Sequence, residues 1–177
     1  MKAIMISIKP KYVAKILNGE KTIEIRKTMP KCDLPIEVYI YCTKDNHQMM
    51  KQFGEYHFNK NIGGYCGFNG KVVAKFTLNK VGIIHDFLNG LEETEPSNRH
   101  ITISTQDELL SSSCLTEEEL RTYGGKYAIH ISDLEIFDKP KELSKFRKCY
   151  RSKGYPQNQS WYLTKAPQSW CYVEDLK

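Results

Sequence analysis

Runs of β-branched and aromatic residues recur along most of this chain, and they limit its fold more than any other feature. Ala3–Ile8 is almost entirely apolar, and Ile36–Thr43 alternates apolar with polar residues. Lys71–Val81, which the polar Asn79 breaks, and Tyr127–Phe137 are longer segments of the same kind. Segments of this composition are typical of strands. They predict a mainly β chain with some helix, an α+β fold whose strands form a closed or nearly closed barrel.

A few helices are predicted to flank these strands. Pro10–Asn18 begins with a proline, which suits a first helical turn, and Gly19 after it suits the left-handed residue that ends a helix. Thr116–Tyr123 has a threonine at the cap position and Glu119 three residues later, the pattern of a capping box. Lys141–Tyr150 is the third segment predicted to be helical.

Length and composition indicate one well-packed domain. The chain has 177 residues, of which 40% are hydrophobic, and this is enough for a single core. We expect one domain over residues 1–177, with insertions around 46–69 and 86–113 that are rich in polar residues. No stretch approaches the roughly 20 apolar residues of a membrane span, so we expect a cytoplasmic protein with no membrane partner.

The segment Gly19–Lys27 carries the best candidate site. Ile23 and Ile25 alternate with charged residues and are predicted to enter the core. Glu24 and Arg26 then share the opposite face, roughly 6–7 Å apart at the backbone. Lys21 joins them only if the chain is still turning after the glycine. The same pattern would also suit an edge strand whose charges face water.

These residues form the pattern Gly-x-Lys-x-x-Glu-x-Arg, which resembles the signature of ASCH domains in the PUA-like superfamily. Further segments, in the same order, are similar to the longer bacterial and phage-type members of this family: Val38–Lys44, Gly70–Leu78, Tyr127–Leu143 and Ala166–Val173. Together they cover a little over half of the chain. The resemblance implies a PUA-like β-barrel flanked by a few helices.

The resemblance also implies an RNA- or nucleotide-binding module, with a possible regulatory use and a cleft lined by Lys21, Glu24 and Arg26. In such a cleft Arg26 would bond a phosphate or carbonyl with its two-pronged guanidinium, and Lys21 would act as a point charge beside it. Glu24 would hold Arg26 in place or accept from a base amino group. Tyr41 and Trp170 are candidates for the cleft wall. No cofactor is expected.

An enzyme is the main alternative. ASCH proteins similar to this one include amidohydrolases that act on N4-acetylcytidine, which use the motif lysine, a threonine three positions later and a more distant glutamate. Lys21 matches that lysine, whereas Glu24 stands where the threonine would be. If the chain is a nucleoside amidohydrolase or a ribonuclease, Lys21 and Glu24 are its predicted catalytic residues.

Charge is distributed unevenly along the chain. The formal net charge is +5, but residues 86–119 carry nine acidic residues against one arginine, and residues 139–153 carry seven basic residues against one glutamate. Aromatic residues lie among and just after the basic ones. This combination suits single-stranded nucleic acid, because cations bond phosphates and flat rings stack on bases. The predicted contact residues are Lys145, Arg147, Lys148, Arg151 and Lys153. A protein-interaction module that uses the acidic stretch is a further alternative.

The cysteines give no sign of a metal site. Six are present, none in a Cys-x-x-Cys pair and none with histidines at zinc-finger spacing. We expect them to be reduced, and no metal is predicted.

Overall fold

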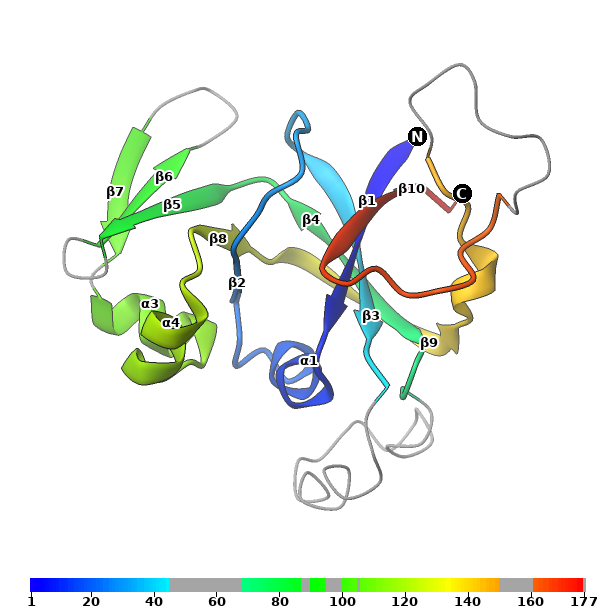
Figure 1. The fold of residues 1–177 in the computed structure, drawn as a ribbon, viewed down its shortest axis with the longest axis horizontal. Coiled ribbons are helices and arrows are strands. Elements are labelled where there is room, and N and C mark those ends of the chain that lie inside the picture. Colours follow the sequence, from blue (N-terminus) through cyan, green and yellow to red (C-terminus); the bar gives the residue numbers. More distant parts are fainter. Residues whose placement is uncertain (45–67, 87–89, 95–99, 105, 150–160, 177) are drawn as a thin grey trace. The chain divides into compact units, whose positions relative to one another are not determined.

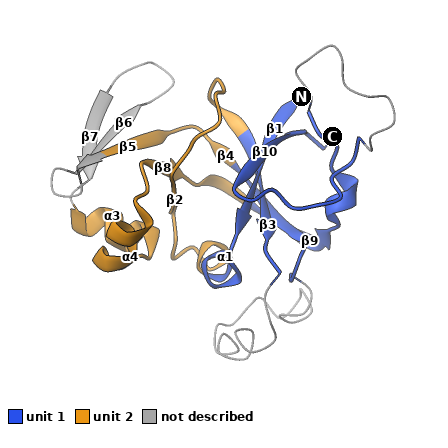
Figure 2. Cartoon of the chain, viewed as in Figure 1, with its two compact units in different colours: residues 1–14, 37–76, 135–177 blue, residues 15–36, 77–134 orange. Residues whose placement is uncertain are grey.

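The computed structural model describes residues 1–44, 68–86, 90–94, 100–104, 106–149 and 161–176 (Figure 1). The chain divides into two compact units, each assembled from separate segments (Figure 2). Unit 1 comprises Met1–Ala14, Glu37–Phe76 and Glu135–Lys177, and unit 2 comprises Lys15–Ile36 and Thr77–Leu134. The single domain expected from the sequence stays a prediction.

One five-stranded sheet has the order β10-β1-β3-β4-β9. Its strands are β1 (Lys2–Ile8), β3 (Ile36–Cys42), β4 (Val72–Leu78), β9 (Ser132–Lys141) and β10 (Trp170–Glu174). β1 pairs parallel with β3 and antiparallel with β10. A buried apolar cluster lies in unit 1: Ala3, Met5, Tyr39, Tyr41, Val72, Phe137, Phe146, Leu163 and Val173.

Tyr39 lies at the centre of this cluster. Its ring packs edge-on against Phe146, with 4.9 Å between centroids. Its hydroxyl donates to Asp175 Oδ1 at 2.7 Å and accepts from the Leu176 backbone N–H at 3.0 Å. Burial, together with the hydrogen bond to Asp175, raises the pKa of Tyr39 above its usual value. The residues after β10 are therefore bonded to the core of unit 1.

The second five-stranded sheet has the order β2-β8-β5-β6-β7. Its strands are β2 (Ile23–Arg26), β5 (Val81–Asp86), β6 (Gly90–Thr94), β7 (His100–Ser104) and β8 (Tyr127–His130). Two helices follow β7 in the sequence, α3 (Gln106–Ser113) and α4 (Glu117–Tyr123). The core cluster of unit 2 joins this sheet to both helices: Ile23, Ile25, Leu109, Leu120 and Ala128.

Two of the predicted helices are confirmed. α1 spans Pro10–Leu17, and Gly19 after it has a φ of +76°. The capping box of α4 is present, because the Thr116 hydroxyl accepts from the Glu119 backbone N–H and the Glu119 carboxylate accepts from the Thr116 N–H. Gly124 ends α4 in the left-handed conformation, with a φ of +60°.

The two longest predicted strands are each interrupted. The segment 71–81 breaks between β4 and β5, and the segment 127–137 breaks between β8 and β9. Two hydrogen bonds join the residues at these breaks. The Ser132 hydroxyl donates to Asn79 Oδ1 at 3.1 Å, and the His130 N–H donates to Lys80 O at 3.2 Å. At each break the chain leaves one sheet and enters the other.

Because the chain passes from one sheet to the other at these breaks, the fold differs from the expected barrel. The α+β class is confirmed. Among the described strands, however, neither hydrogen-bonding order closes on itself, so the pairing shows two five-stranded sheets and no closed barrel.

One further expectation differs from the structure. The predicted helix over 141–150 is wrong, because a short 3₁₀ turn at Leu143–Lys145 is followed by backbone bridges from Arg147 to Tyr162 and from Lys148 to Val173. The segment 86–113, which we expected to be an insertion, contains β6, β7 and α3. Almost all of the other expected insertion, at 46–69, lies outside the described residues.

None of the described helices is long and apolar enough to cross a membrane. Five cysteines are free, and Cys66 lies outside the described residues. No group of three or more His, Cys, Asp or Glu side chains suited to a metal occurs in the described part of the chain.

Candidate functional site

The turn after α1 places Lys21. The Gly19 N–H donates to Ile16 O at 3.0 Å, and the N–H groups of Glu20 and Lys21 both donate to Lys15 O, at 2.9 and 3.0 Å. These bonds satisfy carbonyls that a helix C-terminus leaves without partners, and the left-handed glycine makes them possible. The chain is therefore still turning at Lys21, the condition under which its side chain joins those of Glu24 and Arg26.

Strand β2 is buried on both faces. Ile23 and Ile25 belong to the core cluster of unit 2, as predicted. Glu24 and Arg26 point to the opposite face, since side chains alternate along a strand. They are nevertheless only 8% and 6% exposed, and Lys21 is 2% exposed.

Three oxygens surround the Lys21 ammonium group. Nζ donates to Ile23 O at 2.8 Å and to Ser113 O at 2.6 Å, and it lies 3.2 Å from Glu24 Oε2. An ammonium group has three protons to donate, and these oxygens can accept them. Ser113 is the last residue of α3, and a cation is favourable at the carbonyl end of a helix. Lys21 thus links α3 to β2.

Glu24 lies between two cations. Its Oε2 faces Lys21, and its Oε1 lies 3.1 Å from Arg26 Nη2. Burial lowers the pKa of Lys21, and the attraction of Glu24 opposes that effect. The three side chains form a buried charged group of unit 2, which we call the buried triad (Lys21, Glu24 and Arg26).

The three side chains of the triad converge, and each is at most 8% exposed. In this arrangement a ligand would have to displace Ile23 O, Ser113 O or Glu24 to reach the Lys21 ammonium group. A role of the triad in ligand binding therefore stays a prediction.

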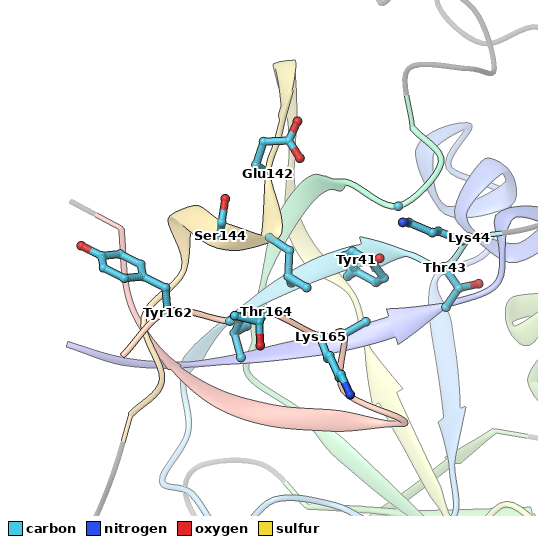
Figure 3. A pocket seen from close by; sticks show the side chains of 12 residues that line it. Tyr41, Thr43, Lys44, Glu142, Ser144, Tyr162, Thr164 and Lys165 are labelled. Atoms are coloured by element: carbon cyan, nitrogen blue, oxygen red, sulfur yellow. The ribbon is translucent and has the colours of Figure 1, made fainter. Parts of the chain in front are cut away.

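Unit 1 contains an open pocket of about 840 Å³ (Figure 3). It lies where the ends of β3 and β9 meet the segment 162–166. Most of its lining side chains are polar or aromatic, and they come from segments far apart in the sequence: Tyr41, Thr43, Lys44, Gly70, Glu142, Leu143, Ser144, Tyr162, Leu163, Thr164, Lys165 and Ala166.

The charges in this pocket are not balanced. Glu142 is ion-paired with Lys71, which lies just outside the lining. Within the described residues, the ammonium groups of Lys44 and Lys165 have no hydrogen-bonding or ion-pairing partner. The pocket thus carries two cations whose charge no carboxylate of the described residues compensates.

The basic segment lies beside exposed aromatic rings. A backbone bridge pairs Arg147 with Tyr162, and the Lys148 N–H donates to Trp161 O at 2.7 Å. Trp161 and Tyr162 are each 48% exposed, and the Arg147 guanidinium carbon lies 6.0 Å from the centroid of the Tyr162 ring. We call Lys145, Arg147, Trp161 and Tyr162 the cation–aromatic surface. Arg151 and Lys153, also predicted to contact nucleic acid, lie outside the described residues.

The predicted wall residues belong to unit 1, whereas the triad belongs to unit 2. Tyr41 lines the pocket, and burial raises the pKa of its hydroxyl. Trp170 lies on β10, with its ring 5.5 Å from that of Tyr172. The sequence prediction therefore combined residues that the structure assigns to two different units.

The sequence did not single out Lys44, Glu142 or Lys165 as site residues. Each lies in or next to a segment that resembles the ASCH family, and this position was the available sign of a functional residue. The segments are Val38–Lys44, Tyr127–Leu143 and Ala166–Val173. That Lys44 and Lys165 line one pocket could not be inferred, because it depends on strand pairing between segments more than 100 residues apart.

Comparisons with known proteins give structural matches alone. No family model and no curated protein matches the chain. A crystal structure of ASCH from Zymomonas mobilis is similar at 16% identity, covering 97% of this chain and 87% of that one, with a TM-score of 0.49. A serine-to-alanine mutant of that protein gives 17% identity, coverage of 97% and 88%, and a TM-score of 0.48.

A tyrosine-to-phenylalanine mutant of the same Zymomonas mobilis protein is also similar, at 18% identity, coverage of 81% and 77%, and a TM-score of 0.46. The matched structures carry the family name that the sequence motifs resemble. All identities lie below 20% and all TM-scores below 0.5, so the function proposed below is argued from the residues of this chain.

Proposed function

We propose that this chain is an RNA-binding module of the ASCH type that contacts single-stranded RNA through unit 1. The proposal includes the PUA-like architecture that the sequence resemblance implies. The observation that carries it is the cation–aromatic surface, where Arg147 lies 6.0 Å from the centre of the exposed Tyr162 ring and the neighbouring Trp161 is also exposed.

The composition of this surface suits a single strand. Lys145 and Arg147 are exposed and can approach phosphates, while the two rings can stack on unpaired bases. Arg147 is also ion-paired with Glu174 at 3.3 Å, with both side chains about half exposed. A pair so exposed contributes little to stability, so a phosphate can replace the carboxylate at small cost.

Salt dependence tests the cation contacts. We expect the affinity for a labelled single-stranded 12-nucleotide RNA, measured by fluorescence anisotropy, to fall with salt at a log–log slope of about 0.7 per phosphate contact. The double substitution Lys145→Ala and Arg147→Ala should reduce that slope by about 1.4. Lys126→Ala, which removes one charge from unit 2, is the matched control.

Stacking is tested separately. Trp161→Ala or Tyr162→Ala should weaken binding by about 1–3 kcal/mol per stacked base and leave the salt slope unchanged. Thermal melts of each variant must first match the parent. If the parental slope and affinity survive all four substitutions, the surface does not bind RNA.

The geometry favours binding over the alternative hydrolase. Lys21 would have to act as a base or nucleophile, yet its protons are bonded to Ile23 O, Ser113 O and Glu24. We therefore expect no appreciable deacetylation when the protein is incubated with N4-acetylcytidine and the products are separated by chromatography. Turnover that disappears in a folded Lys21→Ala variant would overturn the binding proposal in favour of the enzyme.

A further inference from the structure

We propose that the pocket of unit 1 is a subsite for one nucleoside monophosphate group, either a free nucleotide or the phosphorylated end of an RNA strand. Lys44 and Lys165 would bind the phosphate, and the base would lie toward Tyr162 and Glu142. This inference rests on the proposed function, because Tyr162 belongs both to the pocket and to the cation–aromatic surface.

The uncompensated charge points to an anionic ligand. Within the described part of unit 1, neither Lys44 nor Lys165 has a carboxylate partner, so both ammonium groups are available to an anion. Charge-assisted hydrogen bonds from ammonium groups to phosphate oxygens are stronger than neutral ones. A phosphate bound in the pocket would supply an opposite charge to these lysines.

Gly70 fixes the path of one of these lysines. It has a φ of +74°, and a Cβ built on it would lie 2.8 Å from Lys44 Cε and 2.9 Å from Lys44 Cγ. The aliphatic stem of Lys44 therefore packs directly on the glycine backbone. A lysine whose stem is packed in this way loses less conformational entropy on binding than a freely rotating one.

The remaining lining suits a sugar and a base. A pocket of about 840 Å³ is within the range of small-molecule sites. Three hydroxyl side chains, Thr43, Ser144 and Thr164, can donate to phosphate or bond ribose hydroxyls. The partly exposed ring of Tyr162 offers a face on which a base can stack.

Glu142 indicates how the nucleotide is oriented. It is the one carboxylate among the 12 lining residues, and it repels phosphate. In the view of Figure 3, Glu142 and Lys165 lie on opposite sides of Tyr41. Lys71 bonds Glu142 Oε1, so Oε2 is available to accept from a base amino group such as that of cytosine.

Titration calorimetry with cytidine monophosphate, cytidine and uridine monophosphate tests the subsite. We expect cytidine monophosphate to bind about tenfold more tightly than cytidine, because the nucleoside lacks the charged contacts. The double substitution Lys44→Ala and Lys165→Ala should remove this difference. Lys139→Ala, on an exposed lysine of β9 outside the pocket, is the control and should keep it. Equal affinities for cytidine and its monophosphate would overturn the proposal.

The base contact has its own readout. We expect cytidine monophosphate to bind about fivefold more tightly than uridine monophosphate, and Glu142→Ala to bring the ratio close to one. The ratio is used because freeing Lys71 changes the affinity for both nucleotides alike. A parental ratio of one would overturn the placement of the base beside Glu142.

The source of the nucleotide is distinguished with RNA. If the pocket takes the end of a strand, a 12-nucleotide RNA with a 5′- or 3′-terminal phosphate should bind more tightly than its unphosphorylated counterpart, and the lysine double variant should abolish the gain. If it takes free nucleotides, cytidine monophosphate binds and the terminal phosphate gives no gain.

The two proposals fail in different ways. RNA binding that persists when cytidine monophosphate does not bind would overturn the subsite and leave the proposed function standing. Binding of cytidine monophosphate without RNA binding would support the subsite and overturn the proposed function.

Discussion

Lys21 of unit 2 and Lys44 of unit 1 carry the same functional group in opposite surroundings. Lys21 is 2% exposed, and its ammonium group faces three protein oxygens. Lys44 is exposed and, among the described residues, has no acceptor for its protons. The prominence of a lysine in a sequence motif therefore does not decide its role.

The difference also determines what each lysine can do energetically. A buried cation is tolerated where hydrogen bonds and an opposite charge offset its lost hydration, so removing a partner of Lys21 should destabilise the fold. A solvated cation contributes little to folding, and its protons are available to a ligand. Substitutions should then affect stability at the triad and ligand affinity at the pocket.

The largest expected effect is at the triad. Glu24→Gln keeps the shape of the side chain but removes the negative charge that lies between Lys21 and Arg26, and we expect a loss of about 3–5 kcal/mol in the free energy of unfolding. Lys44→Ala should change the same quantity by less than about 0.5 kcal/mol. Urea unfolding curves measure both. Similar losses in the two variants would break the comparison.

A buried neutral group should give a smaller loss. Tyr39→Phe removes the hydroxyl that bonds Asp175 and the Leu176 N–H, and we expect a cost of about 1–3 kcal/mol in urea unfolding. Tyr123→Phe, on a tyrosine that is 38% exposed, should leave the midpoint unchanged.

The same tyrosine makes stability depend on pH. Because its pKa is raised in the folded protein, the folded state keeps the proton at pH values where the unfolded chain has lost it. Its contribution is fully present below about pH 10 and is lost as the pH rises above that value. Tyr39→Phe should lose less stability over this range than the parent.

The glycines near the two lysines provide a matched pair. Gly19 and Gly70 have φ values of +76° and +74°, so alanine at either should cost about 1 kcal/mol in backbone strain. An added Cβ meets nothing within 4 Å at Gly19, whereas at Gly70 it meets the Lys44 stem. We expect only Gly70→Ala to weaken the binding of cytidine monophosphate. Equal affinities in both variants would show that the packing of Lys44 is unimportant.

The smallest expected effect concerns a thiol. Burial raises the pKa of Cys171 to about 11, from an ordinary 9.0. The folded state therefore retains this proton between pH 9 and 11, and stability should decline slightly across that interval. At pH 8 its thiolate fraction is about a hundredfold below that of an ordinary cysteine, so mass-spectrometric mapping should find it slow to alkylate. Fast alkylation in the folded protein would contradict its burial.

Local features of the fold were predictable from the sequence. The proline and glycine that bound α1, the capping box of α4 and the core positions of Ile23 and Ile25 depend on neighbouring residues, and the structure confirms them. The polar Asn79 predicted the break between β4 and β5, and the structure confirms it. The break at Ile131 was not predicted, because it depends on a partner strand distant in sequence. The same is true of the bridges that replace a helix after Leu143–Lys145.

The candidate site was predictable only in part. The convergence of Lys21, Glu24 and Arg26 follows from a glycine turn and strand alternation. Their burial does not, because it depends on α3, whose last carbonyl accepts from Lys21. The pocket of unit 1 could not be predicted, since Tyr41, Glu142 and Lys165 meet only through tertiary packing.

The bond from Lys21 to Ser113 spans 92 residues of sequence, and this separation bears on folding kinetics. Closing so long a loop costs conformational entropy before any contact compensates it. Until α3 docks, the Lys21 ammonium group remains hydrated, and it loses that hydration only when Ser113 O and Glu24 are in place. If docking of α3 follows the folding transition state, Glu24→Gln will mainly accelerate unfolding and leave the refolding rate nearly unchanged.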